Sequence, residues 1–169
     1  MDTNALGRAC SGIAVVVALT ACGPGVDSDT SEEEAAMTHD EAYTRVEEHI
    51  AAAVAVFPEA PELEALGGDI ANPCDDTVDG GESGRASVGR TYWLRGLPAE
   101  DNEASVELLH EYWTANGYQV TDDGRPEDLA VFVENEEDSF RMSVQSSAQG
   151  SLSIGASSPC VWPEGAPGS

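Results

Sequence analysis

The sequence predicts an α+β domain, a two-layer sandwich in which two helices cover one face of a mainly antiparallel sheet. Two segments carry helix-start signals followed by apolar residues at helical spacing. The C-terminal third instead alternates apolar and polar residues, which is typical of strands with one buried and one solvated face. The expected order of elements along the chain is therefore α-β-α-β-β-β-β.

The first helix is predicted by the segment THDE at residues 38–41. This segment is a capping box, because the Thr38 hydroxyl can accept a hydrogen bond from the Glu41 amide while the Glu41 carboxylate reaches back. Apolar residues then recur at helical spacing and form one stripe, made of Tyr43, Val46, Ile50, Val54 and Phe57. Pro58 marks the end of this helix.

Residues 58–84 are rich in Pro, Gly and Asp and predict a loop region. Within it, residues 70–73 form either a short strand at a sheet edge or part of the loop, because Pro73 cannot donate to a neighbouring strand. Oxygen-bearing side chains then alternate faintly as in an EF-hand loop, at Asp75, Thr77 and Asp79, before Gly80. The position of the bidentate glutamate holds Ala86. A plain acidic loop is therefore favoured over a calcium site, and we expect no metal and no cofactor.

A strand is expected over residues 86–94, with Trp93 on the face opposite to that of the apolar residues Val88, Tyr92 and Leu94. Gly96 and Pro98 end it.

The second helix begins at the acidic run 100–103, since negative charge complements the positive end of the helix dipole. Its apolar stripe consists of Val106, Leu109 and Trp113. Gly117 closes the helix, and Tyr118 occupies the position of the hydrophobic contact in a Schellman motif.

The rest of the chain predicts a meander of four strands. They are expected at residues 118–121, 129–134 and 139–145 and around the alternating residues Leu152, Ile154 and Ala156. The segment Pro159–Pro163 ends the ordered chain.

The N-terminal segment has the pattern of a signal peptide. Arg8 precedes an apolar run over residues 12–21, which is too short to span a bilayer but suits the core of a signal peptide. The run ends in Leu19-Thr20-Ala21-Cys22, which resembles the lipobox of bacterial lipoproteins. The resemblance implies diacylglycerol transfer to the Cys22 thiol and cleavage before Cys22. Two acyl chains are enough for stable anchoring, so we expect an extracytoplasmic chain held on the outer face of the cell membrane.

Four parts of the chain are expected from composition. Residues 1–21 form the signal peptide, and residues 22–37 form an acidic tether with almost no large apolar residues, which cannot offset the entropy of ordering. Residues 38–163 form a single domain, and residues 164–169 form a flexible tail.

The chain is strongly acidic, and its charge limits its partners. Its formal net charge is −25, and this value survives removal of the signal peptide, which takes away one acid and one cation. Nucleic acid is excluded, because binding it requires a basic face. Acidic lipid head groups are repelled as well. The charge supports solubility and discourages self-association, so we expect a monomer.

Two cysteines remain in the predicted domain, Cys74 and Cys160. In an extracytoplasmic chain they are expected to pair as a disulfide, in preference to remaining free thiols or binding metal. The three histidines, His39, His49 and His110, show no spacing that would complete a zinc site.

Aromatic and arginine side chains are the favoured candidates for a binding surface, since both dominate binding hot spots. Trp93 and Trp162 are expected to be the most exposed aromatic pair, with Arg95 and Arg141 near them. The interpretation that we favour over a binding surface is that the aromatic residues belong to the core and the arginines pair with surrounding acids.

Four segments in this order resemble a group of small actinobacterial secreted lipoproteins of uncharacterised function: YWLRGLP at 92–98, YW at 112–113 with NGY at 116–118, DSFRMS at 138–143 and SPCVWP at 158–163. The resemblance implies the secreted address, the cysteine pair and the α+β fold, but no activity.

No catalytic residue is predicted, because the sequence lacks a nucleophile elbow, a phosphate loop and a zinc-protease motif. We therefore expect a lipid-anchored, non-catalytic module that binds an envelope protein or a small ligand. The alternative hypotheses are an envelope-polymer hydrolase or transferase with paired carboxylates, and a cation scavenger.

Overall fold

The computed structural model describes residues 37–74 and 84–165 of the chain, all within one compact unit. The signal peptide, Cys22, nearly all of the tether, residues 166–169 and the EF-hand-like residues Asp75, Thr77, Asp79 and Gly80 lie outside the described residues. Those predictions therefore remain predictions.

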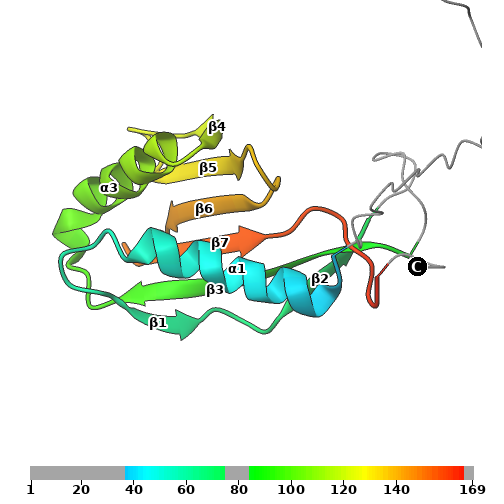
Figure 1. Ribbon diagram of the computed structural model, residues 1–169. Coiled ribbons are helices and arrows are strands. Elements are labelled where there is room, and N and C mark those ends of the chain that lie inside the picture. Colours follow the sequence, from blue (N-terminus) through cyan, green and yellow to red (C-terminus); the bar gives the residue numbers. More distant parts are fainter. Residues whose placement is uncertain (1–36, 75–83, 166–169) are drawn as a thin grey trace, which may run out of the picture. The chain divides into compact units, whose positions relative to one another are not determined.

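Two α-helices, a short 3₁₀ helix and seven strands make up the described chain (Figure 1). In chain order they are α1 (His39–Val54), β1 (Glu62–Ala65), β2 (Ile70–Pro73), β3 (Ala86–Arg95), η1 (Ala99–Asp101), α3 (Asn102–Ala115), β4 (Tyr118–Asp123), β5 (Ala130–Asn135), β6 (Arg141–Ser146) and β7 (Leu152–Ser157).

The seven strands form one antiparallel sheet. Six of them follow one another in the order β1-β3-β7-β6-β5-β4. The remaining strand, β2, pairs with the first half of β3, on residues 86–89, whereas β1 pairs with the last four residues of β3. In Figure 1 the helices α1 and α3 lie on one face of this sheet, α1 over β3 and β7 and α3 over β4, β5 and β6. The predicted α+β two-layer sandwich is therefore confirmed.

The helix boundaries follow from the capping chemistry. The Glu41 amide donates to the Thr38 hydroxyl at 3.3 Å, and the Thr38 amide donates to the Glu41 carboxylate at 2.8 Å, so the predicted capping box is present. At the end of α3, Gly117 has a φ of 79°, a conformation that glycine adopts without strain, and Tyr118 is buried behind it.

The core lies between the helices and the sheet and contains the predicted stripes of both helices. Its largest fully buried side chains are Trp113, Phe140, Ile50, Leu109, Met142, Leu152, Ile154, Val46, Val88, Val106, Val131 and Val133. Apolar positions on β5, β6 and β7 alternate into this core, as their period-two pattern predicts.

The expected order of elements omits two strands, β1 and β2, and a third strand, β4, is longer than expected. The sequence did not indicate β1, and the expected order lacks it, because its four residues hold a single large apolar side chain, Leu63. Residues 70–73 are a strand, and Pro73 lies at its end, where a missing amide costs least. At the opposite edge β4 extends two residues beyond Thr121, and an irregularity between Val120 and Asp122 shifts its register against β5.

A disulfide joins Cys74 to Cys160, whose Cα atoms are 6.2 Å apart. It connects the end of β2 to the segment after β7, beside the place where Ala86 and Val161 exchange two backbone hydrogen bonds of 3.0 Å. The predicted pairing is confirmed. None of the described helices is both long enough and apolar enough to cross a bilayer.

The disulfide closes a loop of 86 residues, and the chain-entropy argument assigns such a loop a stabilisation of about 4–5 kcal/mol. Replacement of both cysteines by serine is expected to lower the free energy of unfolding by that order, measured by chemical denaturation of the mature domain. Reductant should destabilise the natural protein to a similar extent and leave the double variant unchanged. Equal stability of the oxidised and reduced natural protein would contradict this expectation.

Candidate functional site

The four residues of the predicted binding surface lie in three places. The Arg95 guanidinium lies over the Trp93 ring, 5.2 Å from its centroid, so the structure brings this pair together. Trp162 lies at the other end of β3, since its neighbour Val161 pairs with Ala86. At roughly 3.3 Å per residue Trp93 lies about 23 Å along β3 from Ala86, so the two tryptophans do not line one cleft.

Both predicted arginines are engaged by acids. The Arg95 Nε donates to Glu64 at 2.9 Å, and the Arg141 Nε donates to Glu134 at 2.7 Å. Trp93 and Trp162 are each half-buried rather than exposed. The expectation of a single aromatic and arginine surface is therefore replaced by one stacked pair, Trp93 with Arg95, and two separate residues.

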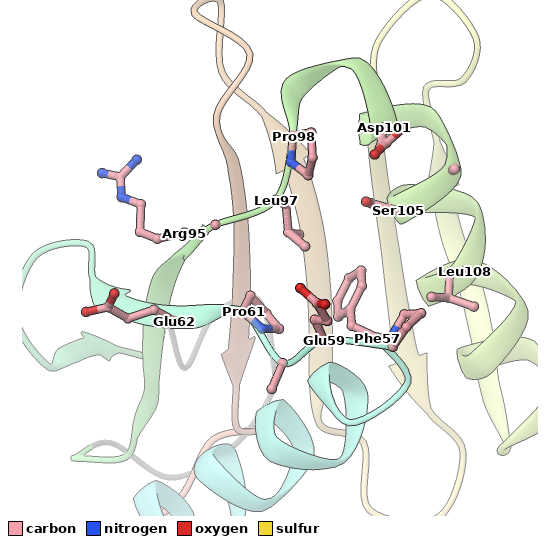
Figure 2. Close-up of a pocket in the computed structure, with 14 residues that line it drawn as sticks. Phe57, Glu59, Pro61, Glu62, Arg95, Leu97, Pro98, Asp101, Ser105 and Leu108 are labelled. Atoms are coloured by element: carbon pink, nitrogen blue, oxygen red, sulfur yellow. The ribbon is translucent and has the colours of Figure 1, made fainter.

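A cleft lies next to that pair, and we call it the α1–α3 cleft. It is a hollow of about 730 Å³ between the segment after α1, the turn after β3 and the first turns of α3 (Figure 2). Its lining residues are Phe57, Pro58, Glu59, Ala60, Pro61, Glu62, Arg95, Gly96, Leu97, Pro98, Asp101, Ala104, Ser105 and Leu108. The volume lies within the range typical of small-molecule sites.

The walls of the α1–α3 cleft are mainly apolar. Phe57 is buried at its base, and Leu97 and Leu108 are half-buried beside it. In Figure 2 the side chains of Glu59 and Leu97 point toward the middle of the cleft, whereas those of Arg95 and Glu62 point away from it. The cleft therefore combines an apolar interior with few polar groups, as ligand sites do.

A second group of polar side chains lies beside α1, with His49 and Tyr118 buried and Arg45 partly exposed. The His49 Nδ1 lies 2.6 Å from the Tyr118 hydroxyl, and the His49 Nε2 lies 3.0 Å from the Asp138 carboxylate. The Arg45 Nε donates to the same Asp138 oxygen at 2.9 Å. We call these four residues the His49 cluster.

The protons of the His49 cluster follow from its charges. Burial raises the pKa of Tyr118 to about 12, so its hydroxyl keeps its proton, and it lies within hydrogen-bond distance of the His49 Nδ1. Burial opposes ionisation of Asp138, but the hydrogen bond from Arg45 and the proximity of His49 outweigh it and lower the Asp138 pKa. The His49 Nε2 therefore carries the proton that it donates to this carboxylate.

The His49 cluster connects three elements far apart in the sequence, α1, β4 and the turn between β5 and β6. His49 and Tyr118 are only 6% and 7% exposed, so the cluster lies mostly inside the fold. Sequence reasoning missed it, because 69 and 89 positions separate His49 from its two hydrogen-bond partners. A buried network whose donors and acceptors are satisfied specifies one packing arrangement, and we assign the cluster this role.

All described arginines have a partner. The ion pairs join Arg45 to Glu48 and Asp138, Arg90 to Glu47 and Asp69, Arg95 to Glu64, Arg125 to Glu107 and Asp123, and Arg141 to Glu134, and Arg85 is engaged as well. Every described arginine therefore already has a partner. The described acids that outnumber these arginines have none of them left to pair with.

The paired-carboxylate hypothesis needs one carboxyl with a raised pKa. Among the described acids, the carboxyl groups with a displaced pKa are all lowered, by hydrogen bonds to Thr38, Arg95, Arg90 and Arg125 and by the surroundings of Asp138. The described histidine, cysteine and acidic side chains also form no group that could hold a metal ion.

Comparison of the chain with protein-family models, with curated proteins and with solved structures finds no match. The lipobox and the four segments that resemble actinobacterial lipoproteins therefore support predictions only.

The His49 cluster yields a prediction about stability. The change Tyr118→Phe leaves the buried His49 Nδ1 without its hydrogen-bond partner, and we expect it to lower the free energy of unfolding by about 1–3 kcal/mol. Urea denaturation of the mature domain measures this loss. Tyr112→Phe is the matched control, because no hydrogen bond of the Tyr112 hydroxyl is seen among the described residues. If the two variants lose the same free energy of unfolding, the hydrogen bond between Tyr118 and His49 does not contribute measurably to stability.

Proposed function

We propose that this chain is a lipoprotein of the cell envelope, held on the outer face of the membrane through Cys22, whose domain binds a small ligand without catalysis. The lipobox pattern around Cys22 supports the anchor. The Cys74–Cys160 disulfide suits an oxidising compartment outside the cytoplasm. The domain acts as a monomer, kept soluble by its net charge of −25.

The α1–α3 cleft is the observation that carries the binding function. An open hollow of about 730 Å³ with apolar walls leaves apolar surface in contact with water. Exposed apolar patches of this kind mark binding sites. Its walls come from three segments held by the core, since Phe57 and Ser105 are both buried and α3 packs on the sheet. Such a hollow is largely preformed, which reduces the entropy lost on binding.

The anchor has a direct test. Mass spectrometry of the protein from its native membrane is expected to show a diacylglycerol on Cys22 as the first residue of the mature chain. The change Cys22→Ser should release the protein from the membrane fraction while the folded domain keeps its thermal stability. Cys22 found as an unmodified thiol, or the protein found in the cytosol, would overturn the proposal.

The binding function is tested on the mature domain with Nile red, an uncharged fluorescent apolar probe. Ala104 lines the cleft and is exposed, so Ala104→Trp is expected to fill the hollow without disturbing the core and to weaken probe binding at least tenfold. Ala115→Trp is the matched control, since Ala115 is exposed at the far end of α3 and lies outside the cleft. Absence of probe binding, or equal loss in both variants, would exclude the cleft as the site.

A further inference from the structure

The polar groups of the α1–α3 cleft point to one class of ligand. We infer that the cleft binds a small amphiphile with an apolar body and a positively charged primary amine. The inference rests on the binding function proposed above and adds the chemistry of the ligand to it. Three observations carry it: the apolar interior, two carboxylates without a partner and the Ser105 hydroxyl, which lines the cleft and has no partner among the described residues.

The apolar interior suits the body of such a ligand. Phe57, Leu97 and Leu108 lie along the cleft, and prolines at 58, 61 and 98 border it. An aliphatic or aromatic group placed among them removes apolar surface of both molecules from water, which is the main favourable contribution to binding.

The carboxylates of Glu59 and Asp101 provide the negative charge. Both line the cleft, and neither makes a hydrogen bond or an ion pair through its side chain with the residues that the structure describes. The one arginine at the rim, Arg95, donates to Glu64 at 2.9 Å and points away from the cleft in Figure 2. The cleft therefore combines an apolar interior with negative charge on the exposed residues Glu59 and Asp101, which favours a cation and repels an anion.

Ser105 provides an independent polar group. It lines the cleft, it is only 7% exposed, and its hydroxyl points into the hollow in Figure 2. Hydroxyl side chains elsewhere on these helices donate to the carbonyl four residues earlier, from Thr44 to Asp40 and from Thr114 to His110. The Ser105 hydroxyl makes no hydrogen bond to any described residue. The Ser105 oxygen is not among the buried polar atoms that lack a partner, so it stays open to the hollow and is available to a ligand.

A primary ammonium fits these three groups together. It carries three N–H donors and no acceptor, so one ammonium can donate to a carboxylate and to the Ser105 oxygen at the same time. Asp101 precedes Ser105 by four positions, about one helical turn, and both line the cleft. A quaternary ammonium has the charge but no donor, and a carboxylate has the wrong charge.

The experiment compares four ligands with similar apolar chains on the mature domain at pH 7 and low salt, below their micelle concentrations. They are decylamine, decyltrimethylammonium, decanol and decanoate, and displacement of Nile red measures their affinities. We expect decylamine to bind at least tenfold more tightly than decanol and several-fold more tightly than decyltrimethylammonium, with decanoate the weakest.

Variants assign this preference to named residues. Glu59→Gln combined with Asp101→Asn should reduce the affinity for decylamine to about that for decanol. Ser105→Ala should weaken decylamine several-fold and decanol less, because the hydrogen bond from a charged ammonium is stronger than that from a neutral hydroxyl. Glu103→Gln combined with Glu111→Gln removes the same charge from exposed positions of α3 outside the cleft and should preserve most of the preference.

The outcomes separate this inference from the proposed function. If Ala104→Trp binds Nile red and decanol as tightly as the natural protein does, the cleft is excluded as the binding site. If decanol, decylamine and decanoate displace the probe from the cleft with equal affinity, the cleft remains the binding site but the inferred class of ligand is wrong. An equal loss of preference in the two double variants would assign the effect to the overall negative charge and overturn the role of Glu59 and Asp101.

Discussion

The backbone pairing of β3 is the constraint on which the rest of the structure depends. One edge of this ten-residue strand carries β1 and β2 one after the other, and its other edge carries β7. At its first residue, Ala86, it also holds the C-terminal segment near the disulfide. The two ends of β3 therefore contribute to different parts of the structure. The disulfide lies beside the first end, and the turn after Arg95 at the other end forms one wall of the α1–α3 cleft.

The distribution of charge follows from the shortage of cations. Ion pairs use the described arginines to hold elements together, as when Arg90 bonds Glu47 on α1 and Asp69 before β2. Because exposed ion pairs contribute little to stability, their main effect here is to position elements and to leave no free positive charge. An acid without a partner, such as Glu59, is then common on the surface. Glu59 becomes a candidate ligand-binding group because it lies beside the apolar hollow and the Ser105 hydroxyl.

Periodicity in the sequence was enough to predict both helices and the meander, because their apolar residues face one continuous core. It failed for β1, whose register is imposed by the backbone of β3 rather than by its own side chains. The His49 cluster and the α1–α3 cleft were beyond prediction for a related reason, since each joins segments that only the tertiary fold brings together. The Trp93 and Arg95 pair was predictable because its members are two residues apart on one strand face.

The backbone at the border of the α1–α3 cleft also favours a cation. Pro58, Pro61 and Pro98 have no amide hydrogen, so these positions of the wall offer an anion no backbone donor. An anion needs several donors to replace its water, whereas an ammonium needs acceptors, which the two carboxylates provide. The fixed φ of proline also stiffens the walls, so less freedom is lost when a ligand enters. Backbone and side chains of the cleft thus select the same kind of ligand.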